Sequence, residues 1–216
     1  VELKIAKAPI RHNNRKPLGS FSPSPMILHV HCNSQSQLGH HNYFIYTHTI
    51  LNRIKMKWVT REHVHVDRVA CPWLIKRFID PNAEFKFIPW PGTELKPEDG
   101  IPFDIPGVEL GHHDNKCSFE AIIEKYNLKD DPALLELAKI VHAADIAADR
   151  DKAPEAAGLE AIASGAMYIV NDDYEALEKE FFIYDALYAY CQLKLLREQY
   201  KEQLEKMSRK ERYEFL

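Results

Sequence analysis

The chain lacks the paired cysteine spacings of a disulfide framework or a zinc finger. Its four cysteines (Cys32, Cys71, Cys117 and Cys191) lie far apart, so we expect free thiols in a reducing, cytoplasmic setting. No run of about 18 apolar residues is present, which argues against a membrane-spanning helix. The beginning of the sequence also lacks an apolar segment followed by a small-residue cleavage site, which argues against a signal peptide.

Acidic residues are nearly absent from residues 1–55, which carry one acid, Glu2, against seven Lys and Arg. Residues 56–216 carry 31 acids against 21 bases, a net charge of −10. The first part also holds six of the eleven histidines and shows no sustained hydrophobic period. We predict that 1–55 is a disordered or non-native upstream segment and that Met56 is the natural start. Metal capture by its histidine pairs, His29/His31 and His40/His41, is an alternative that rests on composition alone.

From Met56 onward the pattern predicts a predominantly α-helical α+β domain over 56–216, with a small mixed β-sheet packed against roughly four or five helices. We expect strands at Lys57–Arg61, 84–89 and 101–105, and a helix over 73–79 that Pro72 opens. Further helices are predicted over 118–126, over 132–148 with Asp131 as the cap, and over 154–169. Asp172 and Asp173 are predicted to cap a long helix from Tyr174.

The long helix carries an apolar stripe with alternating steps of four and three residues, namely Leu177, Phe181, Tyr184, Tyr188, Cys191 and Leu195. After about residue 191 it becomes a highly charged extension. The stripe indicates a buried face and, as a hypothesis, a surface for homo-oligomer formation. Asp185 interrupts it, either as a buried hydrogen-bonded anchor or as a distant ligand.

The densest group of reactive side chains lies between Gly107 and Glu120, where two imidazoles, three carboxylates and a thiol occur within fourteen residues. A second group, His142 and Asp145, has the i, i+3 spacing that places both on one side of a helix. We therefore predict that His112, Glu120, His142 and Asp145 hold a divalent metal ion, with iron, manganese or zinc left open. The alternative is that these are ordinary surface or core residues.

Cys71 and Cys117 each directly precede a predicted helix start. Because a helix N-terminus favours negative charge, we predict lowered thiol pKa values and a redox role for both. Arg68, with Lys76 and Arg77 nearby, is a candidate oxyanion contact, although the same residues also fit a solvated face.

Several segments resemble the ChrB-type chromate-resistance domain. They are DRVACPWLIKRFIDP (67–81), PFDIPGVELGH (102–112), CSFE (117–120), APEAAGL (153–159) and YDALYA (184–189). The resemblance covers about Met56 to Cys191 and implies chromate or a related oxyanion as partner. In longer family members this domain follows an N-terminal region, and the resemblance implies that those proteins are chromate-responsive regulators of an efflux operon. This sequence does not show that region, so DNA binding is not carried over. Some family versions carry an acidic residue directly after the match to His142, whereas Ala143 stands here.

Three functions follow as hypotheses. The first is a chromate-resistance domain that binds a divalent metal or senses chromate through the His/Glu/Asp cluster and nearby thiols. The second is a metal-dependent redox enzyme that reduces chromate or removes reactive oxygen species. The third, a transcriptional regulator, is disfavoured for direct DNA binding by the net charge of −10 over residues 56–216.

Overall fold

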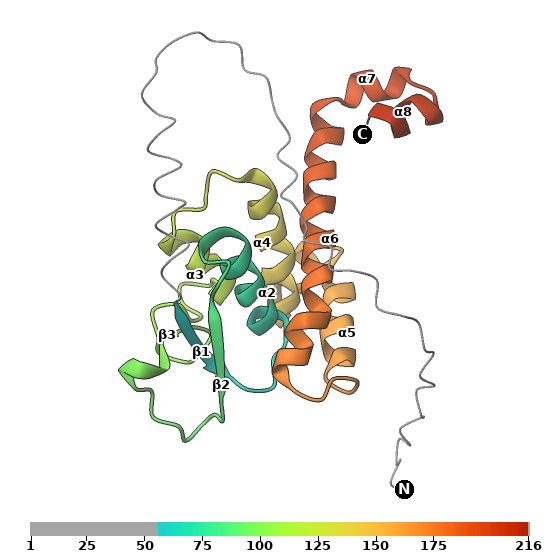
Figure 1. The fold of residues 1–216 in the computed structure, drawn as a ribbon. Coiled ribbons are helices and arrows are strands. Elements are labelled where there is room, and N and C mark those ends of the chain that lie inside the picture. The colour runs from blue at the N-terminus through green and yellow to red at the C-terminus, as the bar shows by residue number, and fades with distance from the viewer. Residues whose placement is uncertain (1–55, 216) are drawn as a thin grey trace, which may run out of the picture. The chain divides into compact units, whose positions relative to one another are not determined.

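The computed structural model describes residues 56–215 (Figure 1). The predictions for residues 1–55, including the histidine pairs, lie outside the described residues. The α+β class with a predominance of helix is confirmed. None of the helices in the described part of the chain is long and apolar enough to span a membrane.

The sheet has three strands, β1 (Lys57–Arg61), β2 (Glu84–Ile88) and β3 (Ile101–Pro102), in the order β2-β1-β3. Both pairings are parallel, with Lys57 opposite Glu84 and Trp58 opposite Ile101, so the expected mixed sheet is corrected to a parallel one. The reason is that a helical crossover connects β1 to β2, as parallel neighbours require.

The central strand β1 is covered on both faces. The alternation of a strand sends Trp58 into the main helical core, where it lies edge-on to Phe103, and sends Val59 into a smaller cluster with Ile88 and Ile105. Because β1 is packed on both faces, its last residue, Arg61, has a defined position.

Helix α2 (Val66–Leu74) begins six residues before Pro72, and the prediction that Pro72 opens a helix is wrong. Buried residues at helical spacing, Val66, Val69, Ala70, Trp73 and Leu74, explain the earlier start. Pro72 lies inside the helix, where its missing N–H leaves the normal i→i−4 ladder incomplete. The chain continues as a π-helical segment, η1 (Ile75–Ile79), which ends with Asp80 N–H donating to the Ile75 carbonyl at 2.8 Å.

The next two helices begin at the residues that the sequence predicts. Helix α3 (Ser118–Lys125) has Cys117 as its N-cap residue, and α4 (Pro132–Asp145) is capped by Asp131, which accepts from Ala133 N and Leu134 N. Helix α4 ends three residues earlier than expected, and the 3₁₀ segment η3 (Ala147–Lys152) follows it.

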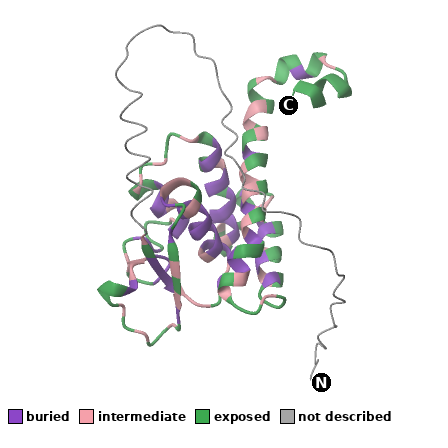
Figure 2. Ribbon diagram, viewed as in Figure 1, coloured by how far each residue is buried: buried purple, intermediate pink, exposed green. Residues whose placement is uncertain are grey.

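The remaining helices are α5 (Ala156–Ala166), α6 (Asp173–Gln199), α7 (Lys201–Lys206) and α8 (Arg209–Phe215). Asp172 caps α6 by accepting from Glu175 N at 2.8 Å. The stripe of α6 packs against the core as predicted, with Leu177, Tyr184 and Cys191 buried. Burial is concentrated in α2 and α4, whereas the last turns of α6 and the helices beyond it are mostly exposed (Figure 2).

An aromatic group joins α2 to α6. Trp73 lies 6.2 Å from Tyr184 and 5.9 Å from Tyr188, measured between ring centroids. The Trp73 indole N–H donates to Asp185 at 2.8 Å, and Arg77 makes two further bonds to the same carboxylate. Asp185 is therefore a hydrogen-bonded anchor and not a distant ligand, but it is half-exposed and not buried as that prediction held.

Candidate metal centre

The carboxyl ends of the strands carry the first two residues of the site. Arg61 is the last residue of β1, and Asp104 follows β3 after one intervening residue. The neighbours of β1 lie on opposite sides, with β2 on one and β3 on the other. In parallel sheets such a switch in strand order opens a crevice at the carboxyl ends, which is where ligands bind.

His112 reaches this edge from the loop that follows β3. The loop is held by Asp104 N–H donating to the Leu110 carbonyl at 3.0 Å, and Gly111 is required because an added Cβ would lie 2.8 Å from the Ile105 carbonyl oxygen. The position of His112 is thus set by a close backbone approach that only glycine permits.

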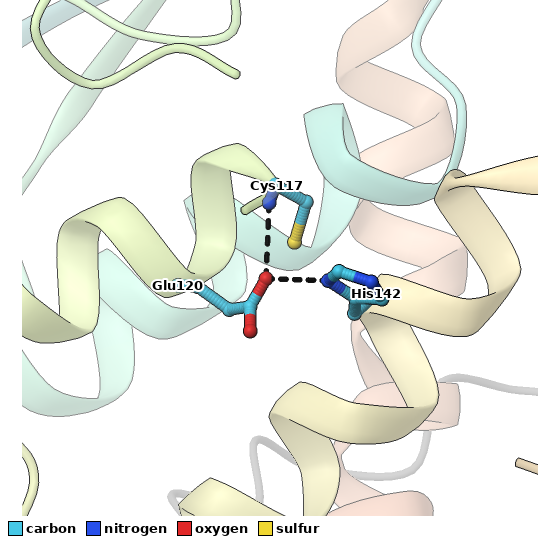
Figure 3. Close-up of side chains that lie close together, drawn as sticks. All are labelled: Cys117, Glu120 and His142. Atoms are coloured by element: carbon cyan, nitrogen blue, oxygen red, sulfur yellow. Dashed lines mark hydrogen bonds and ion pairs between the residues drawn. The ribbon is translucent and has the colours of Figure 1, made fainter. Parts of the chain in front are cut away.

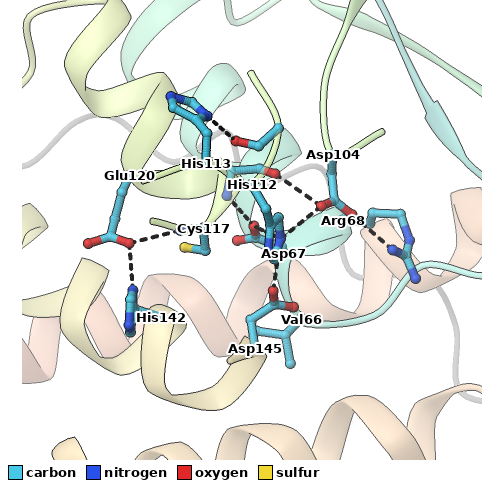
Figure 4. Close-up of polar contacts among 12 residues, drawn as sticks. Val66, Asp67, Arg68, Asp104, His112, His113, Cys117, Glu120, His142 and Asp145 are labelled. Carbon is cyan, nitrogen blue, oxygen red and sulfur yellow. Dashed lines mark hydrogen bonds and ion pairs between the residues drawn. The ribbon is translucent and has the colours of Figure 1, made fainter. Parts of the chain in front are cut away.

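Three carboxylates surround the imidazole of His112 (Figure 4). Its Nε2 atom lies 3.1 Å from Asp145, 3.2 Å from Asp104 and 3.4 Å from Asp67. Hydrogen bonds with these carboxylates raise the pKa of His112 to about 12. A single N–H cannot donate well to three acceptors at once. The arrangement therefore concentrates more negative charge than one imidazole proton can neutralise.

Asp67 is the most deeply buried of the three carboxylates, at 1% exposure. Its Oδ2 accepts from Ser118 N at the start of α3, at 2.6 Å, but its Oδ1 is buried with no hydrogen-bond partner among the described residues. Burial raises the pKa of Asp67 to about 7, against the lowering effect of His112. An orphaned carboxylate oxygen of this kind is rare in folded proteins and is typical of a cation ligand.

Asp104 connects the carboxylates to two arginines. Its Oδ1 faces His112 and accepts from the Ser118 hydroxyl at 3.0 Å, while its Oδ2 accepts from Arg68 at 2.8 Å and Arg61 at 3.0 Å. Burial would raise the pKa of Asp104, but His112 and the two guanidinium groups lower it to about 2. The Nε of Arg68 is buried without a partner in the described part of the chain. We call Asp67, Asp104, Asp145 and His112 the acidic group. Arg68 therefore lies beside the acidic group, next to Asp104.

A second group of candidate ligands lies where the start of α3 meets α4, and consists of Cys117, Glu120 and His142 (Figure 3). Glu120 Oε2 is 2.6 Å from His142 Nδ1 and accepts from Cys117 N–H at 3.0 Å. The other ring nitrogen, His142 Nε2, is 2.7 Å from Asp149 Oδ2. Burial lowers the pKa of His142, but these two carboxylates outweigh it and raise the pKa above its ordinary value.

The two thiols differ from the sequence-based prediction. Cys71 is inside α2 and not at a helix start, and Cys117, although it caps α3, is fully buried. Burial, reinforced by the charge of Asp67, raises the pKa of both thiols well above the ordinary value. The predicted lowering of the pKa is therefore wrong, because desolvation of a thiolate exceeds the favourable effect of a helix N-terminus. A redox role stays a prediction.

The four predicted metal ligands separate into two adjacent groups. His112 lies with Asp145, and Asp67 and Asp104 complete this first group. Glu120 lies with His142, and Asp149 contacts the same imidazole. Asp104 and its partner Arg61 were missed by sequence reasoning. Recognising a parallel sheet would have directed attention to both, since Arg61 is the last residue of β1 and Asp104 follows β3, at the carboxyl ends of strands.

Comparison with known proteins places the chain. The profile of the family described as "ChrB, C-terminal domain" matches residues 58–191, and the chain belongs to this family. It is 35% identical to "Protein ChrB" of Cupriavidus metallidurans over 134 residues, which is 62% of this chain and 40% of that protein. The chain thus matches less than half the length of this curated relative. No solved structure matches it. All residues of both groups fall within the matched range.

Proposed function

We propose that this chain is a chromate-resistance domain whose acidic group binds a divalent metal ion, and that the metal and the neighbouring arginines together receive chromate or a similar oxyanion. Membership of the ChrB family supports the link to chromate resistance. Asp67, Asp104 and Asp145 with His112 would hold the metal, because imidazole and carboxylate oxygens suit manganese, iron or zinc.

The observation that carries the metal proposal is the unpaired Oδ1 of Asp67 beside two further carboxylates. Charges buried in this way need a counter-ion, since desolvated like charges raise each other's energy. The proton on His112 is the smallest counter-ion that the chain itself can provide. A divalent cation would replace it with twice the charge and with coordination bonds to several oxygens at once.

The oxyanion part of the proposal follows from charge. With three carboxylates, two guanidinium groups and a protonated His112 the group is formally neutral. Replacing the imidazole proton by a divalent metal makes it positive. A dianion of the shape of sulfate or chromate would then find a metal ion and the donors of Arg68 and Arg61 on one side of Asp104.

The test is a comparison of metal content and oxyanion binding in the full chain. We expect Asp145→Asn to lower the bound manganese or zinc by one equivalent relative to wild type, while Asp151→Asn, an exposed acid in η3, leaves it unchanged. Arg68→Gln should keep the metal but weaken calorimetric binding of chromate at least tenfold. Arg197→Gln, an exposed arginine on α6, is its matched control.

Molybdate, which has the same shape but is a weaker oxidant, separates binding from oxidation of thiols. Binding of both anions that requires the metal supports the proposal. Wild-type protein that takes up no more metal than Asp145→Asn would refute the metal centre. Equal chromate affinity with and without metal would refute the oxyanion role. Multiple turnovers of chromate by the metal-loaded chain would instead favour the redox-enzyme alternative.

A further inference from the structure

The group formed by Cys117, Glu120 and His142 differs in chemistry from the acidic group. It offers one thiol, one carboxylate and one imidazole, and the potential ligand atoms all lie within 4.8 Å of one another (Figure 3). The other group offers three carboxylates and one imidazole. The two therefore suit different cations, because thiolate and imidazole ligands favour zinc-like ions, whereas carboxylate-rich sites accept manganese or iron(II).

The spacing of the three ligand atoms is compatible with a bound ion. Zinc bonds of about 2.0–2.3 Å in tetrahedral geometry place neighbouring ligand atoms about 3.3–3.8 Å apart. The 2.6 Å contact between Glu120 Oε2 and His142 Nδ1 would lengthen by about 1 Å. The distances from the Cys117 sulfur to these two atoms, which are at most 4.8 Å, would shorten by about 1 Å or less.

The outer partner of His142 is also in place. Asp149 Oδ2 lies 2.7 Å from His142 Nε2, and Lys152 lies 2.8 Å from the same carboxylate oxygen. A carboxylate that accepts the N–H of a ligating imidazole fixes the tautomer, so that the opposite nitrogen is free to bind the ion. In His142 that opposite nitrogen is Nδ1, which faces Glu120 and the thiol of Cys117.

The backbone fixes two of the three ligands on one helical turn. Cys117 is the N-cap residue of α3 and Glu120 is its third residue, and the Cys117 N–H donates to the Glu120 carboxylate. His142 comes from the buried side of α4, which packs against α3. Two rigid helices thus present the group, which is how precise metal sites are built.

We propose that Cys117, Glu120 and His142 bind a zinc-like divalent cation independently of the Asp67–His112–Asp145 group, so that the domain carries two cation sites of different chemistry. Three protein ligands leave a fourth position for water. On binding, the Cys117 thiol and His142 Nδ1 each lose a proton to solvent. This inference goes beyond the proposed function and does not depend on it, because the two groups share no ligand.

Cobalt(II) is the probe that identifies a thiolate ligand, since it gives a thiolate-to-cobalt charge-transfer band and occupies zinc sites. The full chain is freed of metal and titrated with cobalt, and zinc is then added to displace it. We expect the charge-transfer band in wild type and an unchanged band in Cys191→Ser. In Cys117→Ser we expect the band to be lost and the protein to bind one equivalent of cobalt less than wild type. Cys191 is the matched control because it is also buried, but on α6.

The six histidines of residues 1–55 and Cys32 add further candidate ligands. The test therefore rests on the difference in bound cobalt between variants and not on the total cobalt that the wild type binds. A variant that keeps only Cys117, with Cys32, Cys71 and Cys191 changed to Ser, must retain the band. This variant also gives a reading if Cys117→Ser does not fold, as judged by circular dichroism.

Absence of the band in wild type, or its survival in Cys117→Ser, overturns the proposal. Loss of the band in Asp145→Asn would show a single shared site and also overturn it, while leaving the proposed function intact. Conversely, a normal cobalt band combined with manganese uptake that Asp145→Asn does not change would support this second site and refute the first.

Discussion

Replacing Asp185 by Ala tests the connection between α2 and α6. Asp185 accepts from the buried indole of Trp73 at 2.8 Å and from Arg77 at 2.9 and 2.6 Å. The connection bears on the site because α2 also carries Asp67 and Arg68.

The two interactions of Asp185 differ in strength. Trp73 is 1% exposed, so loss of its acceptor leaves a buried N–H unsatisfied, which costs about 1–3 kcal/mol. Arg77 and Asp185 are each 41% exposed, and a partly solvated ion pair contributes at most about 1 kcal/mol after screening. We therefore expect Asp185→Ala to lower the free energy of unfolding by about 1–4 kcal/mol, and Arg77→Gln by about 1 kcal/mol or less.

The measurement is urea unfolding of the full chain, followed by circular dichroism at constant pH and salt. Asp185→Asn is the conservative control, since its amide oxygen can still accept from the Trp73 indole, and it should recover most of the loss. If Asp185→Ala costs no more than Arg77→Gln, the buried indole bond contributes nothing and the reasoning is refuted. A loss that disappears in high salt would likewise assign the effect to the ion pair alone.

Three further predictions concern single carboxylates. Burial raises the pKa of Glu180 from 4.5 to about 7, so the folded state holds a proton that the unfolded state releases over this range, and stability falls as pH rises through it. Glu180→Gln removes this penalty. In denaturant titrations, its free energy of unfolding relative to wild type should rise by about 1–3 kcal/mol between about pH 5 and pH 8. A difference between the two proteins that stays constant with pH would contradict the assignment. Asp149→Asn should weaken zinc binding at the Cys117 group by about 10–100-fold in competition with a chelator, because it removes the outer partner of His142. Asp131→Ala removes the cap of α4 and also the acceptor of the Tyr188 hydroxyl, so it should cost about 2–3 kcal/mol in the same unfolding assay, with an exposed Asp130→Ala as the neutral control.

Local sequence signals predicted most of the helical elements. Asp131 and Asp172 marked the starts of α4 and α6 because a carboxylate caps free N–H groups wherever a helix begins. The apolar stripe of α6 followed from spacing alone, and the family was recognisable from continuous motifs. Pro72 misled the prediction of α2, since the buried stripe of that helix overrides the preference of proline for a first turn.

The composition of the candidate centre depended on tertiary structure. The i, i+3 spacing of His142 and Asp145 suggested a shared site, yet packing directs the first toward Glu120 and the second toward His112. Burial reversed the expected pKa shift of Cys117, an effect that the sequence around a residue does not encode. Asp104 and Arg61 are 43 residues apart and meet only because β3 and β1 are parallel neighbours. The sequence alone determined which ligand types the domain possesses and where α3, α4 and α6 begin. Which of these candidate ligands lie together was decided by the fold, because their distances and their burial depend on elements that lie far apart along the chain.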